Sequence, residues 1–429
     1  MSIKILATGD LHLGKRSSGI PENEPSGSAI YTWERIVDWC LTNDVDVLAL
    51  LGDIVDSENR IYQAIKPLFD GFTRLQEKGI RVLMISGNHD YDVPAQVDRS
   101  VELDNVTVLG RDGRWEVHSF NKGDLSVQFV GWSFPGESFA LNPLLDFNSL
   151  PLDNSLPVIG LLHCDVNAQN SAYAPVPLAG LVSKQLDAWL LGHIHKPMEL
   201  NKSMPLVRYA GSPHAFSAKE PGEHGPLLVT VNGKNDIKAQ TVPMSPVRYE
   251  TITMEVQATM QQADFRTGLM QQLITDVEAK KKESISLKHL IYDIELVGSH
   301  ENLALADHWM TEIATAELTP SGDVQFAIRK VSSNLMTHIT GLEEYISENT
   351  PVGLLAGTIL AIKENSSTPM LDRLMEQWIK NYQHMQNSPT YSILGNTPMD
   401  RDALADLAKA SILKECNRMI SELINQQSE

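Results

Sequence analysis

The sequence predicts an α/β (α+β) fold: a two-sheet β-sandwich flanked by helices, then a small βαβαβ capping domain and a helical C-terminal region. Through residues 1–245, short apolar, β-rich runs alternate with stretches whose apolar residues recur at helical spacing. The first three of these runs end in Gly followed by Asp or Asn, at the strand ends where open α/β sheets place ligand sites. Two prolines within 242–248 then mark a boundary, because proline interrupts regular elements.

The N-terminal part begins with a βαβαβ pattern. Strands are expected at Lys4–Thr8, Val45–Leu51 and Ile80–Ser86, with helices over Ala29–Leu41 and Arg60–Glu77 between them. This order implies a parallel or mixed sheet covered by helices. The spacing of the later strands predicts a second sheet packed face to face with the first. Those strands are expected at Val127–Trp132, Val158–His163, Ala188–Gly192, Leu206–Ala210 and Leu227–Val231.

The chain is expected to divide into three parts, at 1–245, 246–335 and 341–429. The tail from about Gly341 carries apolar stripes at helical spacing, which predicts a helical region. The middle part alternates strand and helix in a compact module. Its elements are expected at Tyr249–Val256, Met260–Val277, Leu290–Leu296, Asn302–Ile313 and Val324–Lys330.

Charge and cysteine content limit the function classes. The 429 residues include 35 basic and 54 acidic side chains, a net charge of −19 that is shared almost equally by residues 1–250 and 251–429. A generic nucleic-acid binder carries a basic footprint, so any contact with DNA must come from bound cations, local Lys/Arg clusters or a partner protein. Three distant cysteines without a CxxC pair indicate a reducing compartment. With no signal peptide and no membrane span evident, a cytoplasmic location is expected.

Four short motifs at the predicted strand ends carry Asp, Asn and His side chains. Several of them have ordinary readings when taken alone: Asp-x-His is usually a turn, and Gly-Asp is common in loops. Gly-Asn-His-Asp is much more specific. A fifth candidate is His163, at the end of a predicted strand, although a lone histidine usually packs in a core. Together the motifs and His163 offer seven candidate ligands, too many for one metal but suited to a pair that shares a carboxylate. Imidazole with carboxylate favours Mn, Fe, Zn or Ni over Ca. The motifs are Gly9-Asp10-Leu11-His12, Gly52-Asp53-Ile54-Val55-Asp56, Gly87-Asn88-His89-Asp90 and Gly192-His193-Ile194-His195.

This set of motifs, over about residues 3–231, resembles the calcineurin-like metallophosphoesterase superfamily and its fold. The resemblance implies two divalent metal ions, with Asp53 bridging them. His89 would face the scissile phosphate, Asp90 would orient His89, and Asp56 would support the site. One ion would be held by Asp10, His12 and His195, and the other by Asn88, His163 and His193.

Further features resemble the SbcD family of DNA double-strand-break repair nucleases. They are Asp10-Leu-His-Leu-Gly14 before a long polar loop, Tyr209-Ala-Gly-Ser-Pro213 followed by Gly222-Glu-His-Gly225, and the appended module and tail. The resemblance implies manganese-dependent exonuclease and endonuclease activity on DNA, a capping role for the module, and a tail that binds a coiled-coil ATPase of the SbcC type. It also implies a homodimer formed through helices of the first part, for which Ala29–Leu41 and Arg60–Glu77 are candidates.

Two other functions remain compatible with the sequence. The acidic charge suits a small-molecule or nucleotide phosphodiesterase or phosphatase of the same superfamily, which would act on nucleotides but not on DNA. A scaffold with a vestigial site would show no metal-dependent turnover, although the complete set of candidate ligands argues against it.

Overall fold

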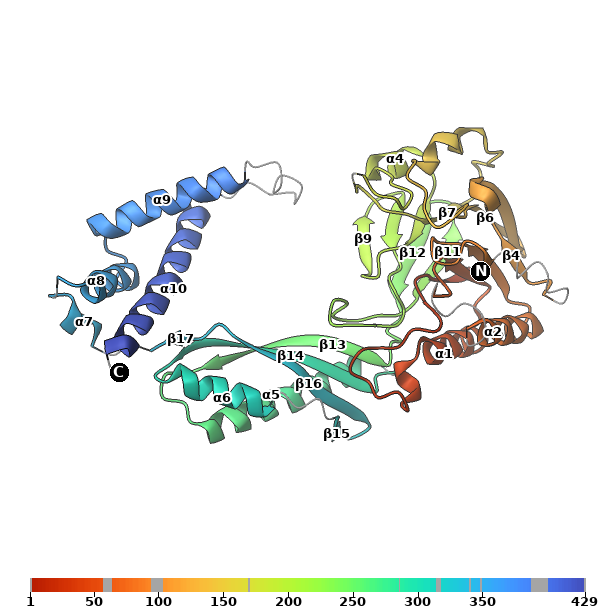
Figure 1. Cartoon of the computed structure of the whole chain (residues 1–429). Coiled ribbons are helices and arrows are strands. Elements are labelled where there is room, and N and C mark those ends of the chain that lie inside the picture. Colours follow the sequence, from red (N-terminus) through yellow and green to blue (C-terminus); the bar gives the residue numbers. More distant parts are fainter. Residues whose placement is uncertain are drawn as a thin grey trace. The chain divides into compact units, whose positions relative to one another are not determined.

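The structure is a computed structural model that describes residues 2–56, 64–93, 103–168, 170–284, 286–313, 318–338, 341–347, 349–386 and 400–427 (Figure 1). The chain forms two compact units. The first comprises Met1–Thr251, Gln272–Asp293 and Thr315–Arg329, and the second comprises Ile252–Gln271, Ile294–Ala314 and Lys330–Glu429.

The first sheet of the first unit has six strands in the order β12-β11-β1-β2-β3-β4. Strands β1 to β4 are parallel neighbours, and β11 and β12 add antiparallel strands at the β1 edge. The strands are β1 (Ile3–Thr8), β2 (Val47–Leu51), β3 (Arg81–Ile85), β4 (Val106–Val108), β11 (Leu227–Gly233) and β12 (Asp236–Thr241).

Helices α1 (Ala29–Thr42) and α2 (Ile65–Glu77) cover one face of this sheet. Strand β2 is buried on both faces, because Leu48 and Leu50 pack with the helices while the residues that alternate with them pack toward the second sheet. The N-terminal end predicted for α2, at Arg60, falls within 57–63, outside the described residues.

The second sheet has the order β5-β6-β7-β8-β10-β9, with a parallel centre and antiparallel edge strands. The short helix α4 (Leu178–Ser183) packs on its outer face, where the Trp189 indole donates a hydrogen bond to the Leu181 carbonyl (3.0 Å). The strands are β5 (Glu116–Lys122), β6 (Leu125–Trp132), β7 (Val158–His163), β8 (Ala188–Gly192), β9 (Met198–Asn201) and β10 (Leu206–Tyr209). Three 3₁₀ turns lie at Pro25–Gly27, Arg111–Gly113 and Pro143–Ser149.

An apolar core between the two sheets, including Ile5, Ala49, Phe129 and Ile159, makes the first unit a two-sheet sandwich with outer helices. The predicted fold class is therefore confirmed. Strands β4, β5, β9 and β12 were not predicted, since each is either very short or largely polar.

The predicted module forms a third sheet in the order β13-β14-β16-β15, with β17 beside β14. Within the first unit, Tyr249, Ile291 and Ala327 of this sheet pack with Ile20 and Ala215. Within the second unit, Phe265 stacks on Trp309 with ring centroids 5.3 Å apart. The elements are β13 (Val247–Val256), α5 (Gln262–Glu283), β14 (His289–His300), α6 (Leu303–Ile313), β15 (Thr319–Ser321), β16 (Val324–Ser333) and β17 (Met336–Thr337).

The C-terminal region is helical, as predicted, and the helices pack around a core that includes Ala356, Ile359 and Ile420. The helices are α7 (Leu342–Tyr345), α8 (Pro351–Lys363), α9 (Pro369–Gln386) and α10 (Arg401–Gln427). No helix in the described part of the chain is long and apolar enough to cross a membrane.

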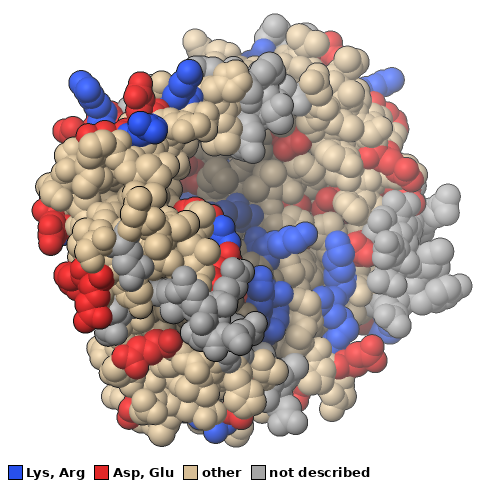
Figure 2. Space-filling model, turned by 60° about the vertical axis from the view of Figure 1, so that its left-hand side comes forward, with Lys and Arg blue, Asp and Glu red and all other residues tan. Residues whose placement is uncertain are grey.

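Figure 2 shows both basic and acidic side chains on the face in view.

Candidate metal centre

The sandwich brings the predicted site residues to the carboxyl ends of its parallel strands. Strands β1, β2 and β3 of one sheet and β8 of the other each end at one of the four sequence motifs, and β7 ends at His163. Loops that leave parallel strands at the same edge meet there, which is where open α/β sheets place ligands.

Three groups of donor atoms form at this edge within the described residues, and in each group the atoms lie within 4.8 Å of one another. In the first, His12 and His195 point their Nε2 atoms at each other across 3.1 Å. His193 lies outside these groups of His, Asp and Glu side chains, although its ring centroid is 5.2 Å from that of His163. The groups are Asp10 with His12 and His195, Asp10 with Asp53 and His163, and His12 with Asp56 and His89.

Several buried polar atoms at the site lack hydrogen-bond partners among the described residues, as metal ligands would in the absence of the metal. Among the described residues, Asn88 Oδ1 and His163 Nε2 are buried without a hydrogen-bond partner. Burying such atoms unpaired costs free energy, and a cation would satisfy both. Two facing imidazole nitrogens also suit a shared cation. The donor set, imidazole with carboxylate and amide oxygen, therefore fits divalent transition metals.

The histidines of the site are held through their other ring nitrogens. Such contacts fix which nitrogen carries the proton and leave the opposite lone pair for a metal. The hydrogen-bond partners are the Leu51 carbonyl for His163 Nδ1 (2.9 Å) and Glu220 Oε1 for His195 Nδ1 (2.7 Å). Asp56 Oδ1 lies at ion-pair distance from His12 Nδ1 (3.4 Å), and Asp165 Oδ1 lies at ion-pair distance from His193 Nε2 (3.5 Å).

Glu220 and Asp165 are functional candidates that the sequence analysis missed. Glu220 lies 25 positions from the histidine that it contacts, in a segment without helix or strand, so neither spacing nor periodicity points to it. Asp165 lies two positions after His163, and an acidic residue directly after a strand was the only available signal.

Four residues of the site have left-handed backbone conformations that non-glycine residues rarely adopt. They are Asp10 (φ 50°), His12 (φ 45°), Asp53 (φ 52°) and His193 (φ 99°). Such strain persists only where the surrounding structure enforces it, and it clusters at functional sites. All four are predicted metal ligands, so the backbone supports the prediction independently of the side chains.

The family comparison decides what kind of domain carries this site. Residues 3–197 match the family model described as calcineurin-like phosphoesterase. This region is a calcineurin-like metallophosphoesterase domain. Domains of this family use a dimetal centre, which agrees with the candidate ligand groups.

Similar proteins include several nucleases. The chain is 29% identical over 256 residues to the uncharacterized metallophosphoesterase YhaO of Bacillus subtilis, covering 58% of this chain and 62% of that protein. It is 26% identical over 248 residues to the DNA double-strand break repair protein Mre11 of Methanosarcina mazei, covering 56% and 38%. It is 25% identical over 288 residues to a subunit of the nuclease SbcCD of Escherichia coli, covering 57% and 69%. The chain thus spans less than two thirds of the first two relatives.

The electrostatics of the metallophosphoesterase site centre on Asp53. Burial would raise the pKa of Asp53, but the neighbouring His163 and His12 and a hydrogen bond from the His89 N–H (2.9 Å) hold it well below its usual value. Asp53 is therefore an anion, which is the state that its predicted bridging role requires. The Asp10 carboxylate accepts the His193 N–H at both oxygens (3.1 and 3.0 Å), which fixes its direction.

Asp90 and Asp56 support the loops around the ligands. The buried Asp90 carboxylate accepts hydrogen bonds from the N–H groups of Asp53 (3.2 Å), Ile54 (2.7 Å) and Gly87 (2.7 Å). Burial and the charge of Asp53 together raise the pKa of Asp90. Burial also acts to raise the pKa of Asp56, but bonding to His12 and the charge of Lys15 lower it to about 2.

His89, the predicted catalytic residue, lies beside the candidate ligands. Its ring stands edge-on to the His12 ring, with centroids 5.0 Å apart. Burial lowers the pKa of the His89 imidazole, and the charge of Asp53 opposes that effect. The His89 imidazole therefore lies at the edge of the candidate metal centre.

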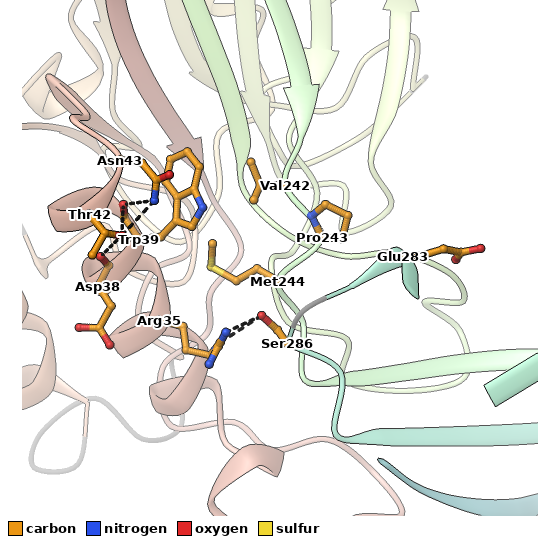
Figure 3. A pocket seen from close by; sticks show the side chains of 10 residues that line it. All are labelled: Arg35, Asp38, Trp39, Thr42, Asn43, Val242, Pro243, Met244, Glu283 and Ser286. Carbon is orange, nitrogen blue, oxygen red and sulfur yellow. Dashed lines mark hydrogen bonds between the residues drawn. The ribbon is translucent and has the colours of Figure 1, made fainter. Parts of the chain in front are cut away.

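A separate cavity of about 500 Å³ lies in the first unit beside the C-terminal half of α1 (Figure 3). On one wall, the Arg35 guanidinium donates hydrogen bonds to Ser286 Oγ from Nε (3.2 Å) and Nη2 (2.7 Å). None of the residues lining the cavity was predicted as a site residue. They are Arg35, Asp38, Trp39, Thr42, Asn43, Val242, Pro243, Met244, Glu283 and Ser286.

Proposed function

We propose that this chain is a manganese-dependent DNA nuclease with exonuclease and endonuclease activity, acting with an SbcC-type ATPase in DNA end processing or repair. Relatives named as nucleases and double-strand break repair proteins support DNA as the substrate. The observation that carries the proposal is the convergence of imidazole and carboxylate donors at one edge of the sandwich, together with the unpartnered atoms His163 Nε2 and Asn88 Oδ1.

The ligand assignment follows the sequence prediction. Asp53 would lie between the two metal sites, since its carboxylate stands 4.0 Å from His12 Nε2 on one side and 3.4 Å from His163 Nε2 on the other. We assign Asp10, His12 and His195 to one ion, and Asn88, His163 and His193 to the second.

Two divalent cations held there would bind phosphate oxygens and lower the pKa of a water, which supplies the nucleophile for in-line attack. The protein residues orient the reaction. The bond from the His89 N–H to Asp53 Oδ1 fixes the backbone next to the ligand, and the His89 side chain stabilises charge on the phosphate or donates to the leaving oxygen. Asp90 fixes the two loops relative to each other, because its carboxylate accepts the N–H groups of Asp53 and Gly87.

The charge of the chain implies that DNA binding depends on a partner. Affinity for DNA grows with the number of phosphates that a protein neutralises, and a chain with a net charge of −19 offers few such contacts. We expect the isolated protein to bind DNA weakly and the SbcC-type partner, docked on 341–429, to restore binding. Tight DNA binding by the protein alone would contradict this expectation.

The first experiment incubates the purified protein with Mn²⁺ and end-labelled double-stranded DNA, and separately with a chromogenic phosphodiester. A His89→Ala variant is assayed in parallel. DNA degradation that the variant loses is expected. If neither substrate is hydrolysed with the partner present, and Asp53→Ala changes nothing, the proposal is refuted in favour of a scaffold.

A nucleotide or small-molecule phosphodiesterase is the second candidate, favoured by the acidic charge. Hydrolysis of the small diester, with DNA intact even after addition of the partner, would select this function. The proposed homodimer through α1 and α2 is tested by the molar mass of the protein in solution.

A further inference from the structure

The carboxylate of Glu220 contacts the metal site without belonging to any of its sequence motifs. Its Oε1 atom lies 2.7 Å from His195 Nδ1, and its Oε2 atom accepts the Phe216 N–H at 2.7 Å. Both oxygens are therefore used, one on a predicted metal ligand and one on the backbone. The side chain is only 14% exposed, so water competes little for either bond.

This contact determines the state of the His195 ring. An ionised carboxylate can only accept hydrogen bonds, so the proton of the neutral imidazole must lie on Nδ1. The opposite nitrogen, Nε2, then presents its lone pair toward His12 Nε2, 3.1 Å away, and toward Asp10.

The loop around Glu220 is itself fixed, so the carboxylate is ordered before a metal binds. The Glu220 N–H donates to the Ser217 carbonyl (2.9 Å). The Phe216 carbonyl accepts the Ser18 N–H (2.8 Å) and the hydroxyl of Tyr249 on β13 (3.2 Å). A continuous chain of bonds thus runs from Tyr249 through Phe216 and Glu220 to His195, all within the first unit.

We infer that Glu220 is a positioning residue for the metal ligand His195: it sets the proton on Nδ1 and aims Nε2 at the metal site. The inference rests on the proposed function only in taking His195 as a ligand. A carboxylate behind a metal-binding histidine fixes the ring and raises its basicity, and the loss of such a partner typically weakens metal binding about 10- to 100-fold.

The test replaces Glu220 by glutamine. In Glu220→Gln only one side-chain oxygen remains to accept a hydrogen bond, so it cannot serve both His195 Nδ1 and the Phe216 N–H. The new NH₂ group, itself a donor, then faces one of these two donors. The matched control is Glu223→Gln, the same change three residues further along. The Glu223 side chain is 40% exposed and reaches Arg248 Nη1 at 3.5 Å, away from the predicted ligands.

Calorimetric titration of the metal-free proteins with Mn²⁺ gives the first readout. We expect Glu220→Gln to lose about tenfold or more in affinity at one of two sites, with the other site and the Glu223→Gln control close to the parent protein. A folded Glu220→Gln variant that binds Mn²⁺ at both sites with the affinities of the parent protein would overturn the inference.

A second readout needs neither activity nor metal. Nitrogen-15 NMR of labelled histidine in the parent protein should show His195 protonated on Nδ1, with assignment from a His195→Gln variant. A neutral His195 ring with its proton on Nε2 and none on Nδ1 would overturn the inference even if Glu220→Gln failed to fold. A protein that binds two Mn²⁺ ions but leaves DNA intact would refute the proposed function alone.

Discussion

Gly87 stands against the carboxylate that we assign as the bridging ligand, so Gly87→Ala tests the centre with a single methyl group. A Cβ at Gly87 would lie 2.2 Å from Asp53 Oδ1 and 2.7 Å from the Asp53 nitrogen. The backbone of Gly87 is not left-handed, so the substitution adds no strain of that kind, and the three atoms nearest to the new Cβ all belong to Asp53.

The size of the effect follows from the displacement. Asp53 Oδ1 must move by about 0.8 Å to reach the 3.0 Å below which real Cβ contacts essentially do not occur. The oxygen that faces His12 and His163 is Asp53 Oδ2, which moves together with Oδ1 because the two belong to one carboxylate. Metal–ligand distances vary by only about 0.2 Å, so a displacement of this size would weaken the hold of Asp53 on both metals. A shift of about 1 Å costs roughly 100-fold in activity. Crowding costs about 1–3 kcal/mol of unfolding free energy, and the lower entropy of the unfolded alanine chain offsets less than 1 kcal/mol of it.

The assay compares Gly87→Ala with Gly136→Ala, whose added Cβ would meet nothing within 4 Å. Mn²⁺ affinity by calorimetry, hydrolysis of a chromogenic diester and urea unfolding are measured for both variants. We expect Gly87→Ala alone to lose metal binding and activity while remaining folded. Activity and affinity within about twofold of the Gly136→Ala control would refute the placement of Asp53 between two metals.

Three other predictions follow from buried groups and from the metal site. Burial lowers the pKa of His214 from 6.5 to about 4, so the unfolded chain takes up a proton that the folded protein excludes. The parent should therefore lose up to about 3 kcal/mol of unfolding free energy between pH 6.5 and pH 4, and His214→Gln should lose less in urea titrations; equal losses would contradict this. Mn²⁺ at 100 times its dissociation constant should add about 2.7 kcal/mol per site, so chelation with EDTA should lower the Tm, and an unchanged Tm would argue against a metal centre. Burial raises the pKa of the Cys40 thiol to about 12, and all three cysteines are buried, so Ellman's reagent should label them only after unfolding; rapid labelling of the native protein would contradict this.

The parts of the fold that the sequence predicted are those whose signals are local. Apolar runs such as Val158–His163 end at a motif, and the strand β7 has those same bounds. Strand β12 alternates exposed and half-buried residues at a sheet edge, so its sequence shows no apolar run. Helix α5 extends to Glu283, past the predicted end at Val277, because the lysines there continue a helix that apolar periodicity no longer marks.

The candidate site also contains residues that local sequence patterns predict and residues that they do not predict. Asp10, Asp53 and His193 lie next to glycines at strand ends, and this pattern is visible without a structure. Glu220 meets His195 only because a segment without regular structure folds back onto the site, and no local pattern encodes that contact. The contacts of Asp90 with three backbone N–H groups likewise depend on how two loops meet. The predicted boundaries at 245, 335 and 341 and the roles of the individual ligands remain predictions.

The left-handed backbone affects how the sequence can evolve at four positions, which are Asp10, His12, Asp53 and His193. Glycine adopts this conformation without the steric cost that a Cβ brings, which is roughly 1 kcal/mol per position, so the working residues are retained against a standing bias. A lineage that ceased to use the metals would drift toward glycine at these four positions. In descendant sequences that have lost the activity, substitutions should therefore appear first at these left-handed positions.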